Sequence, residues 1–330
     1  MCGFPTEVLF LSRQDIDAII TYEDVVAAVE SAFRADGNGD MYVPPKEIMD
    51  VAPGTANSMF AMPGLLRDIG VAGVKWTGFY PQNPDGLPTL WGLVLLLSHM
   101  HNGQLFAILD ATTITAMRTS GGHAVVAAKY LAKKDSKTLG ILGCGAQGRS
   151  GILSFDRHFP LERIIVHDHS RERYDLIVHE LGGQLRARLE WAENPEILAI
   201  QSDILLCATT SEEPLIKADW IQKGCFVAAM YAFNDIDPGL SASADKWVIG
   251  HAGSDRIEIL ELPVFLGKID PENVFATLGE IITGKKPGRQ DDNERIVFTH
   301  MGMGSLDIAV GNHLVKKARE HGLGQVLRLT

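Results

Sequence analysis

Short apolar segments alternate with helix-like segments along the second half of the chain. The apolar segments have the length and the content of Val, Ile and Leu that buried strands require, and helix-like sequence lies between most of them. They are Thr138–Gly143, Arg163–His167, Ile204–Ala208, Cys225–Ala229 and Lys246–Gly250. Alternation of this kind is typical of strand–helix–strand units, and it predicts an α/β domain with a doubly wound parallel sheet.

The first part of the chain has a different order of predicted elements, in which several strands follow one another. Ser12, with Asp15 three residues later, predicts the start of a short helix. The other elements we expect there are strands at Glu7–Leu11, Ser58–Met62, Val71–Thr77, Gly92–Ser98 and Leu105–Leu109, and a long helix at Thr112–Tyr130. We therefore expect an α+β domain over residues 1–128, joined by a last helix within about residues 306–330, and a doubly wound domain over residues 129–305.

The most informative segment is a predicted strand that leads directly into Gly143-Cys144-Gly145-Ala146-Gln147-Gly148. In this G-x-G-x-x-G pattern the first glycine makes a tight turn, the second lets the backbone approach a pyrophosphate, and the third lets the next helix pack closely. The N-terminus of that helix, with Ala146 and Gln147, would hold the pyrophosphate. The segment predicts a Rossmann-type dinucleotide-binding domain, and a glycine-rich turn in an unrelated α/β domain is the alternative.

A second strand-like run ends on Asp168, which lies about 20 residues beyond the glycines, where a dinucleotide-binding unit places an acid. Its carboxylate would accept hydrogen bonds from the adenosine ribose and repel a 2′-phosphate. We therefore expect NAD rather than NADP as the cofactor, although Arg171 and Arg173 are near enough in sequence to meet a 2′-phosphate.

Three hydroxyl side chains, Thr209, Thr210 and Ser211, follow another predicted strand. Ligands of open α/β sheets lie beyond the carboxyl ends of the strands, so these side chains are candidates to line the dinucleotide site. A turn closed by a hydroxyl group is the alternative.

Composition narrows the class of protein. The chain has 330 residues, 46% hydrophobic and 22% charged, with a formal net charge of −11. This charge argues against a general nucleic-acid or anionic-membrane binder. The four cysteines are scattered, and the histidines lack metal-ligand spacing, so we expect no disulfide framework and no metal site. The sequence has no signal-like N-terminus and no apolar run long enough to span a membrane. We therefore expect a cytoplasmic protein.

Three cations are candidates to bind a carboxylate. Lys75 stands in an otherwise apolar strand, where burying an ammonium group is costly unless the group is paired or used. Arg118 stands in a helical stretch and could form a bidentate clamp, and Lys46 follows Pro44-Pro45. The alternatives are a solvent-facing strand-edge lysine, a helix-surface arginine and a solvated loop lysine.

Two further residues are candidates for proton transfer or substrate contact. Asp235 lies just after the strand that ends near Met230 and is a candidate acid or base. His300 lies in Phe298-Thr299-His300-Met301-Gly302, which we interpret as a Gly/Met-rich loop before the last helix. It could face the site, and a surface loop histidine is the alternative.

These segments together resemble the ornithine cyclodeaminase/μ-crystallin family, which includes archaeal-type alanine dehydrogenases and imine reductases. The resemblance rests on Lys75 with the loop 81–89, Thr115-Ala116-Met117-Arg118-Thr119, the segment 127–138 and the glycine loop. Leu278-Gly279-Glu280, Gly284-Lys285, Gly302 and Asp307 match the C-terminal part of the family pattern. The motifs occur in the right order over nearly the whole chain.

The resemblance implies a homodimer whose N-terminal domain supplies the interface and the substrate pocket, while the Rossmann domain brings NAD(H). It implies that Lys75 contacts the carboxylate or amine of the substrate, that Arg118 clamps the carboxylate and that Lys46 stands where relatives often have arginine. Thr119 would lie by the cofactor. The implied chemistry is hydride transfer between Cα of a small α-amino or imino acid and the nicotinamide.

Two departures from the family pattern affect the choice of reaction. Ornithine cyclodeaminases carry G-A-D or G-G-D followed by P-G-K, and the Asp there is the proposed base. Here Phe233 or Asn234 occupies that position, with Asp235 as the nearest substitute, and His300 stands where many relatives have serine. We therefore expect an amino-acid dehydrogenase or imine reductase; the alternatives are ornithine cyclodeaminase and a non-catalytic NAD(P)H-binding protein like μ-crystallin.

Overall fold

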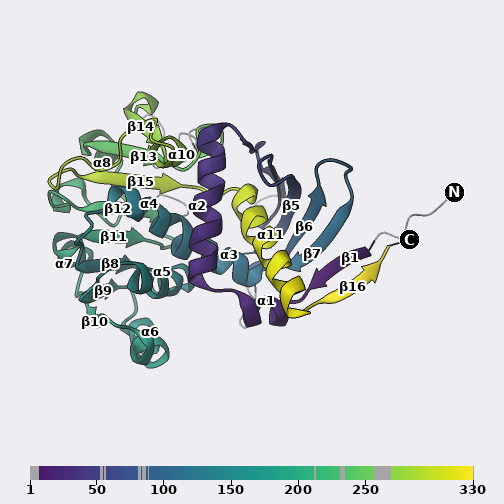
Figure 1. Ribbon diagram of the computed structural model, residues 1–330. Helices are drawn as coiled ribbons and strands as arrows, with labels where there is room; N and C mark the ends of the chain where they lie inside the picture. Colours follow the sequence, from purple (N-terminus) through teal and green to yellow (C-terminus); the bar gives the residue numbers. More distant parts are fainter. Residues whose placement is uncertain are drawn as a thin grey trace. The chain divides into compact units, whose positions relative to one another are not determined.

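The computed structural model describes residues 7–52, 55, 57–80, 83, 87, 89–211, 213–230, 235–255 and 269–329. The chain divides into two compact units, Met1–Arg118 with Met303–Thr330, and Thr119–Gly302 (Figure 1). The division assigns Thr119–Ala128 to the second unit, whereas the sequence analysis placed them in the first. It also begins the returning C-terminal segment at Met303.

The first unit contains a mixed sheet with strand order β16-β1-β7-β6-β5-β4-β2, and β3 pairs with β4. Its strands are β1 (Glu7–Leu11), β2 (Met41–Tyr42), β3 (Glu47–Asp50), β4 (Ser58–Leu66), β5 (Val71–Phe79), β6 (Leu90–His99), β7 (Leu105–Asp110) and β16 (Gln325–Arg328). Its helices are α1 (Arg13–Ile19), α2 (Tyr22–Asn38), α3 (Thr112–Arg118) and α11 (Gly304–His321). Helix α1 begins with the predicted capping box between Ser12 and Asp15.

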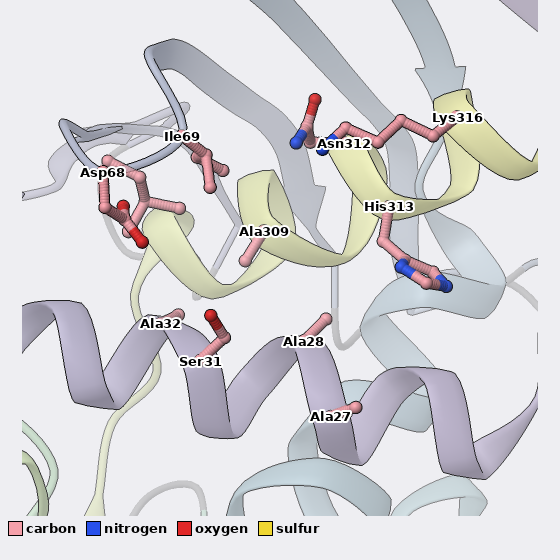
Figure 2. A pocket seen from close by; sticks show the side chains of 11 residues that line it. Ala27, Ala28, Ser31, Ala32, Asp68, Ile69, Ala309, Asn312, His313 and Lys316 are labelled. Carbon is pink, nitrogen blue, oxygen red and sulfur yellow. The ribbon is translucent and has the colours of Figure 1, made fainter.

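Helix α11 packs on strands β4, β5 and β6 and beside α2. A cavity of about 230 Å³ lies between α2 and α11 (Figure 2). Small side chains of α2 line one wall, and His313 and Lys316 of α11 line the other. None of the predicted site residues lines this cavity.

The second unit is built on a parallel sheet with strand order β10-β9-β8-β11-β12-β15-β13-β14. Its strands are β8 (Thr138–Leu142), β9 (Arg163–His167), β10 (Arg188–Trp191), β11 (Ile204–Cys207), β12 (Phe226–Met230), β13 (Lys246–Ile249), β14 (Val274–Thr277) and β15 (Ile296–His300). Its longer helices are α4 (Val125–Leu131), α5 (Ala146–His158), α6 (Arg171–Leu181) and α7 (Pro195–Gln201); α8 (Gly239–Ser243) and α10 (Leu278–Ile282) are short. The predicted Rossmann-type α/β fold is confirmed.

The strand order reverses between β8 and β11, which is the place where a doubly wound sheet binds a dinucleotide. Strand β15 comes late in the sequence but is inserted between β12 and β13. Its residue pairs join Met230 of β12 to His300 of β15. The carboxyl end of β15 therefore lies at the same edge of the sheet as the carboxyl ends of its parallel neighbours.

The long helix predicted at Thr112–Tyr130 is interrupted. A π-helical segment, η1 (Thr119–Ala124), follows α3 and leads into α4. The Ser120 N–H donates to Oε1 of Gln147, and the Gly121 carbonyl accepts from the Ser154 hydroxyl. These two contacts join η1 to α5, and π-helical turns are often found at functional sites.

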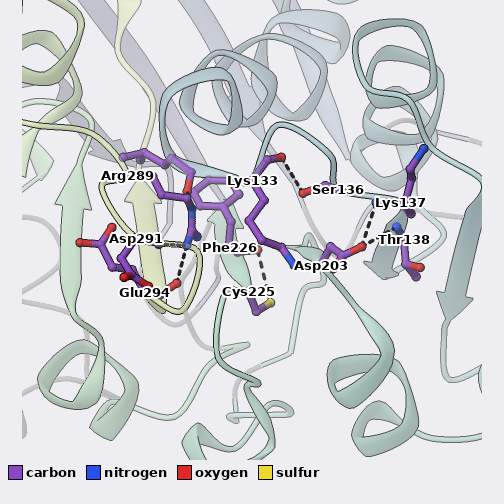
Figure 3. A network of polar contacts seen from close by, with 11 residues as sticks. Lys133, Ser136, Lys137, Thr138, Asp203, Cys225, Phe226, Arg289, Asp291 and Glu294 are labelled. Carbon is purple, nitrogen blue, oxygen red and sulfur yellow. Dashed lines mark hydrogen bonds and ion pairs between the residues drawn. The ribbon is translucent and has the colours of Figure 1, made fainter.

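Asp203 lies where the strands of the parallel sheet begin, opposite to the edge formed by their carboxyl ends (Figure 3). One carboxylate oxygen accepts the N–H groups of Lys137 and Thr138 at 2.8 and 3.0 Å, and the other accepts Nζ of Lys133 at 3.1 Å. Burial opposes ionisation of Asp203, but these hydrogen bonds outweigh it and lower its pKa. These bonds hold the start of β8, the strand that leads into the glycine loop. No helix among the described residues is long and apolar enough to cross a membrane.

Candidate functional site

The glycine loop has the geometry that its sequence predicts. Gly143 follows β8 with φ of 103°, a left-handed conformation that favours glycine. A Cβ on Gly148 would collide with the Gly143 carbonyl oxygen, whereas a Cβ on Gly145 would have nothing within 4 Å. The middle of the loop is therefore open above the N-terminus of α5, where N–H groups favour an anion. These residues fit a bound pyrophosphate.

Asp168 is buried directly after β9 and is oriented by its neighbours. Its Oδ2 accepts the Cys144 N–H at 2.7 Å, and its Oδ1 accepts the Ser170 N–H at 3.1 Å. The acid therefore joins the end of β9 to the glycine loop, so its carboxylate lies next to the place where a dinucleotide would bind. Burial and the Asp168 charge raise the pKa of the Cys144 thiol to about 12, so this cysteine is a neutral thiol at physiological pH.

Asp235 contacts the loop that follows β11. It accepts hydrogen bonds from the hydroxyl and the N–H of Thr209, and the Thr209 Oγ1 in turn accepts the Ser211 N–H at 3.0 Å. Burial raises the pKa of Asp235 to about 6, against the lowering effect of the Thr209 hydrogen bonds. The hydroxyl-closed turn expected as the alternative for Thr209–Ser211 is present, with Thr210 exposed. Asp235 as an acid or base stays a prediction.

Lys75, Arg118 and Asp307 form a buried ionic cluster within the first unit. Oδ2 of Asp307 lies 3.1 Å from Nζ of Lys75, and Oδ1 lies 3.0 Å from Nε of Arg118. The exposed fractions of the three residues are 2%, 4% and 0%. The solvent-facing alternatives for Lys75 and Arg118 are therefore wrong. Strand β5 presents Lys75 to the face that α11 covers, and α11 carries Asp307.

Burial and neighbouring charges shift the pKa values of the residues in this cluster. Burial and the neighbouring Arg118 charge lower the pKa of Lys75 to about 8, against the opposing effect of Asp307, and Lys46 contributes a further lowering. Burial opposes ionisation of Asp307, but Arg118 and Lys75 outweigh it and lower its pKa. Two buried cations thus share one carboxylate, which leaves an excess positive charge that a second carboxylate would neutralise.

His300 ends strand β15 and is 1% exposed, so its interpretation as a loop residue with a surface alternative is wrong. Its Nδ1 lies 2.5 Å from Oδ2 of Asp255, and its ring centroid lies 4.6 Å from that of His123 in η1. The apolar run Ile296–Phe298 before His300 was the signal for this strand, but the glycines after it indicated a loop.

Sequence reasoning missed the roles of Asp307, Asp255 and His123. Asp307 was recognised as part of a motif but not as the counter-ion of Lys75 and Arg118, although a buried lysine in an apolar strand implies one. Asp255 and His123 had no local signal, because their partner, His300, is distant in sequence. Among the described residues, no group of His, Cys, Asp and Glu side chains could hold a metal ion.

Comparison with known proteins places the chain in a family. The profile of the ornithine cyclodeaminase/mu-crystallin family matches residues 6–322. Alanine dehydrogenase of Archaeoglobus fulgidus is 31% identical over 330 residues, which are 98% of each chain. The chain therefore belongs to the ornithine cyclodeaminase/mu-crystallin family, as its motifs predicted.

Solved structures agree with this membership. The Δ1-pyrroline-2-carboxylate reductase of Thermococcus litoralis, solved with NADH and L-proline, superposes with a TM-score of 0.88 at 30% identity, covering 96% of this chain and 99% of that one. An archaeal alanine dehydrogenase dimer with bound NAD superposes with a TM-score of 0.86 at 28% identity, covering 98% and 100%.

Proposed function

We propose that this protein is an NAD(H)-dependent oxidoreductase that acts at Cα of a small α-amino or imino acid. The observation that carries the proposal is the buried cluster of two cations on one carboxylate, in a chain that also has a dinucleotide-binding loop. Relatives that are named as alanine dehydrogenase and Δ1-pyrroline-2-carboxylate reductase support this substrate class.

The cluster has the charge that a substrate carboxylate requires. Lys75 and Arg118 carry two positive charges against the single negative charge of Asp307. A carboxylate ligand would bring the second negative charge. Lys46 would add to the attraction for that carboxylate, because its positive charge acts on Lys75. Asp307 holds both cations in place before the ligand binds. Less side-chain conformational entropy is therefore lost when the ligand binds.

The residues that would hold the dinucleotide are Gly143, Gly145, Ala146, Gln147, Gly148, Asp168, Thr119 and Thr209–Ser211. When bound, the nicotinamide ring would supply or accept the hydride. The protein's part is to bind and orient the two reactants and to move a proton at the substrate nitrogen.

Asp168→Ala is expected to weaken NADH binding by about 10- to 100-fold, because hydrogen bonds to a charged group are lost, and to weaken NADPH binding far less. The measurement is the dissociation constant of each dinucleotide from the fluorescence of the bound nicotinamide. Asp168→Asn is the control for the loop, since its amide oxygen can still accept the Cys144 N–H. An unchanged ratio of NADH to NADPH affinity in Asp168→Ala would refute the ribose role.

We also propose that the chain is a homodimer through the face of its first sheet opposite to α11. Met49 of β3, Trp76 of β5 and Trp91 of β6 are exposed by 36%, 40% and 45%. Strand register joins Met49 to Met59, Met59 to Gly78, and Gly78 to Trp91, so the side chains lie along one face. An exposed apolar row of this kind is typical of a surface that another chain covers.

Trp76→Arg is expected to convert the dimer to a monomer, because a desolvated guanidinium would replace an apolar anchor at the interface. Light scattering after size-exclusion chromatography measures the mass. Ile200→Arg, at a 44% exposed position of α7, is the matched control and should leave the dimer intact. A wild-type protein that elutes as a monomer would contradict the proposal.

The reaction is tested by a panel of amino acids with NAD, and of keto acids with ammonia or amines and NADH, followed at the nicotinamide absorbance. Proline and free ammonia from ornithine are measured alongside. Net NADH formed in proportion to an amino acid supports the proposal. Ammonia and proline without net NADH would instead identify a cyclodeaminase, and dinucleotide binding without turnover on the whole panel would identify a binding protein.

A further inference from the structure

The cavity between α2 and α11 has an apolar middle and two charged ends (Figure 2). Its volume is about 230 Å³, and every residue that lines it belongs to the first unit. Asp68, in the turn after β4, lies at one end of the lining residues, and Lys316 of α11 lies at the other. The apolar side chains that line the cavity include Ala28, Ala32, Leu66 and Ala309.

Asn312 of α11 is a buried polar side chain on the wall of this cavity. It is 7% exposed, and no hydrogen bond joins its side-chain amide to another of the described residues. Buried amides normally have a hydrogen-bond partner, and this one offers both a donor and an acceptor. Asn312 therefore indicates that a polar group of a ligand enters the cavity.

The two ends of the cavity carry opposite charges. Asp68 and Lys316 are exposed, and no ion pair joins either of them to another residue that the structure describes. His313 of the same wall is already engaged, because its Nε2 lies 3.1 Å from Oδ1 of Asp24. A complementary ligand therefore has an anionic group that faces Lys316 and an ammonium group that faces Asp68.

The length of the cavity separates these two groups of the ligand. Lys316 follows Ala309 by seven residues, which is about 10 Å along α11. Asp68 lies beyond Ala309 as seen from Lys316 (Figure 2). The amino and carboxyl groups of a simple α-amino acid share one carbon atom and cannot reach both ends. A linear ω-amino carboxylate can, because a chain of methylene groups separates its charges and would lie against the alanine side chains.

The walls of the cavity continue to the buried ionic cluster of the first unit. On α11, Ala309 follows Asp307 by two residues. On β4, Leu66 lines the cavity and Met62 pairs with Lys75 of β5. The open cavity and the assembled cluster occur in the same arrangement of the first unit, so a ligand that binds in the cavity stabilises that arrangement.

We propose that this cavity is an effector site for a linear ω-amino carboxylate. The carboxylate of the ligand pairs with Lys316 and accepts a hydrogen bond from the Asn312 amide, and its ammonium group pairs with Asp68. The bound ligand holds α11 against α2 and thereby favours the assembled cluster. The binding site does not depend on the proposed function, whereas the effect on the reaction rests on it.

The first experiment measures binding by calorimetry, with 6-aminohexanoate as the probe. A dissociation constant of about 1 mM or below is expected. Hexanoate and hexylamine each lack one charge and should bind at least about threefold more weakly. Lys75→Met should bind 6-aminohexanoate as the wild type does, which distinguishes the cavity from the ionic cluster. No binding of 6-aminohexanoate, or equal binding of the three compounds, would overturn the proposal.

Two variants test the position of the ligand. Ala28→Leu fills the cavity and should abolish binding, whereas Ala18→Leu, at an exposed position of α1, is the control and should bind normally. Asn312→Leu has a similar volume without the amide, so it should weaken binding by about 3- to 10-fold and leave the protein folded. Binding as tight in Ala28→Leu as in the wild type would show that the ligand lies elsewhere.

Charge variants test the orientation of the ligand. In Lys316→Met the carboxylate of the probe loses its partner, so 6-aminohexanoate should bind no better than hexylamine. In Asp68→Asn it should bind no better than hexanoate. Asp50→Asn, at an exposed position of β3, is the matched control and should keep the preference for 6-aminohexanoate. A preference that persists in both cavity variants would contradict the assigned contacts.

The last experiment measures the effect on the reaction with the substrate that the panel identifies. Saturating 6-aminohexanoate is expected to lower KM of the wild type by about fivefold or more. In Ala28→Leu the ratio of KM with and without 6-aminohexanoate should be one. An unchanged KM in a wild type that binds 6-aminohexanoate would overturn the effector role. If the wild type turns over nothing on the panel, the proposed function fails, while the calorimetry still decides whether the binding site exists.

Discussion

Lys75→Ala is expected to abolish turnover while NADH binding stays intact. Lys75 is buried beside Asp307 and Arg118 in the first unit, whereas the glycine loop and Asp168 belong to the second. Loss of a charge-assisted contact to the substrate carboxylate or amine should reduce kcat/KM by about 10²- to 10⁴-fold. Steady-state kinetics and NADH fluorescence measure the two effects separately.

Lys75→Met separates charge from packing, because methionine is similar in length and has no charge. Turnover should be lost as in the alanine variant, but the free energy of unfolding should be kept or increased, since burial of the lysine opposes its ionisation. Lys316→Ala, at an exposed position of α11, is the control for loss of a lysine and should be fully active. Near-normal activity of either Lys75 variant would show that the cluster does not bind substrate.

The same lysine predicts a dependence of stability on pH. Its pKa is lowered from 10.5 to about 8 in the folded protein, so the unfolded chain binds more protons between these values. The free energy of unfolding should therefore gain a contribution from Lys75 as the pH rises from 8 to 10.5. The difference between wild type and Lys75→Met in urea unfolding isolates that contribution.

Asp307→Ala is expected to have the largest effect on stability. It leaves two buried cations without their shared counter-ion, and removal of one member of a buried ion pair costs about 3–5 kcal/mol. Turnover should also fall sharply, because Lys75 and Arg118 lose the group that positions them. Urea unfolding at neutral pH, combined with the kinetic assay, measures both effects.

The stabilising effect of Asp307 has a defined pH window. Its folded pKa is lowered below 3.8, so its contribution is complete above that value and is lost as the pH falls through the folded pKa. The difference in unfolding free energy between wild type and Asp307→Ala should therefore shrink in acid. The double variant Lys75→Met/Asp307→Ala should recover part of the lost stability, and a double variant no more stable than Asp307→Ala would contradict the ionic explanation.

The sequence predicted those parts of the fold whose signals are local. About thirty residues contain the glycine pattern, the strand before it and the acid after it. The sequence therefore allowed this strand–helix–strand unit to be recognised as a whole. The interruption of the helix at η1 was not predicted, and the hydrogen bonds that join η1 to Gln147 and Ser154 come from another helix and have no local sequence signal. Strand β16 was missed since it is short and exposed and forms only by pairing with β1.

In the candidate site too, the residues with local sequence signals were predicted and those without such signals were missed. Lys75 was identified because a cation in an apolar strand is unusual, and Arg118 because of the motif around it. Their partner Asp307 is 232 residues away from Lys75, and no local pattern pairs them. The strand that ends at His300 was concealed by the glycines after it, so the buried pair with Asp255 became visible only when the sheet was assembled.

We propose that hydride passes between the nicotinamide and Cα of a small amino or imino acid. The most direct measurement uses NADH with deuterium in the transferable position at C4, together with the imino acid, or the keto acid and ammonia, that the panel identifies. Mass spectrometry and NMR of the amino-acid product should show a single deuterium, located at Cα. A product without deuterium at Cα would contradict the claim.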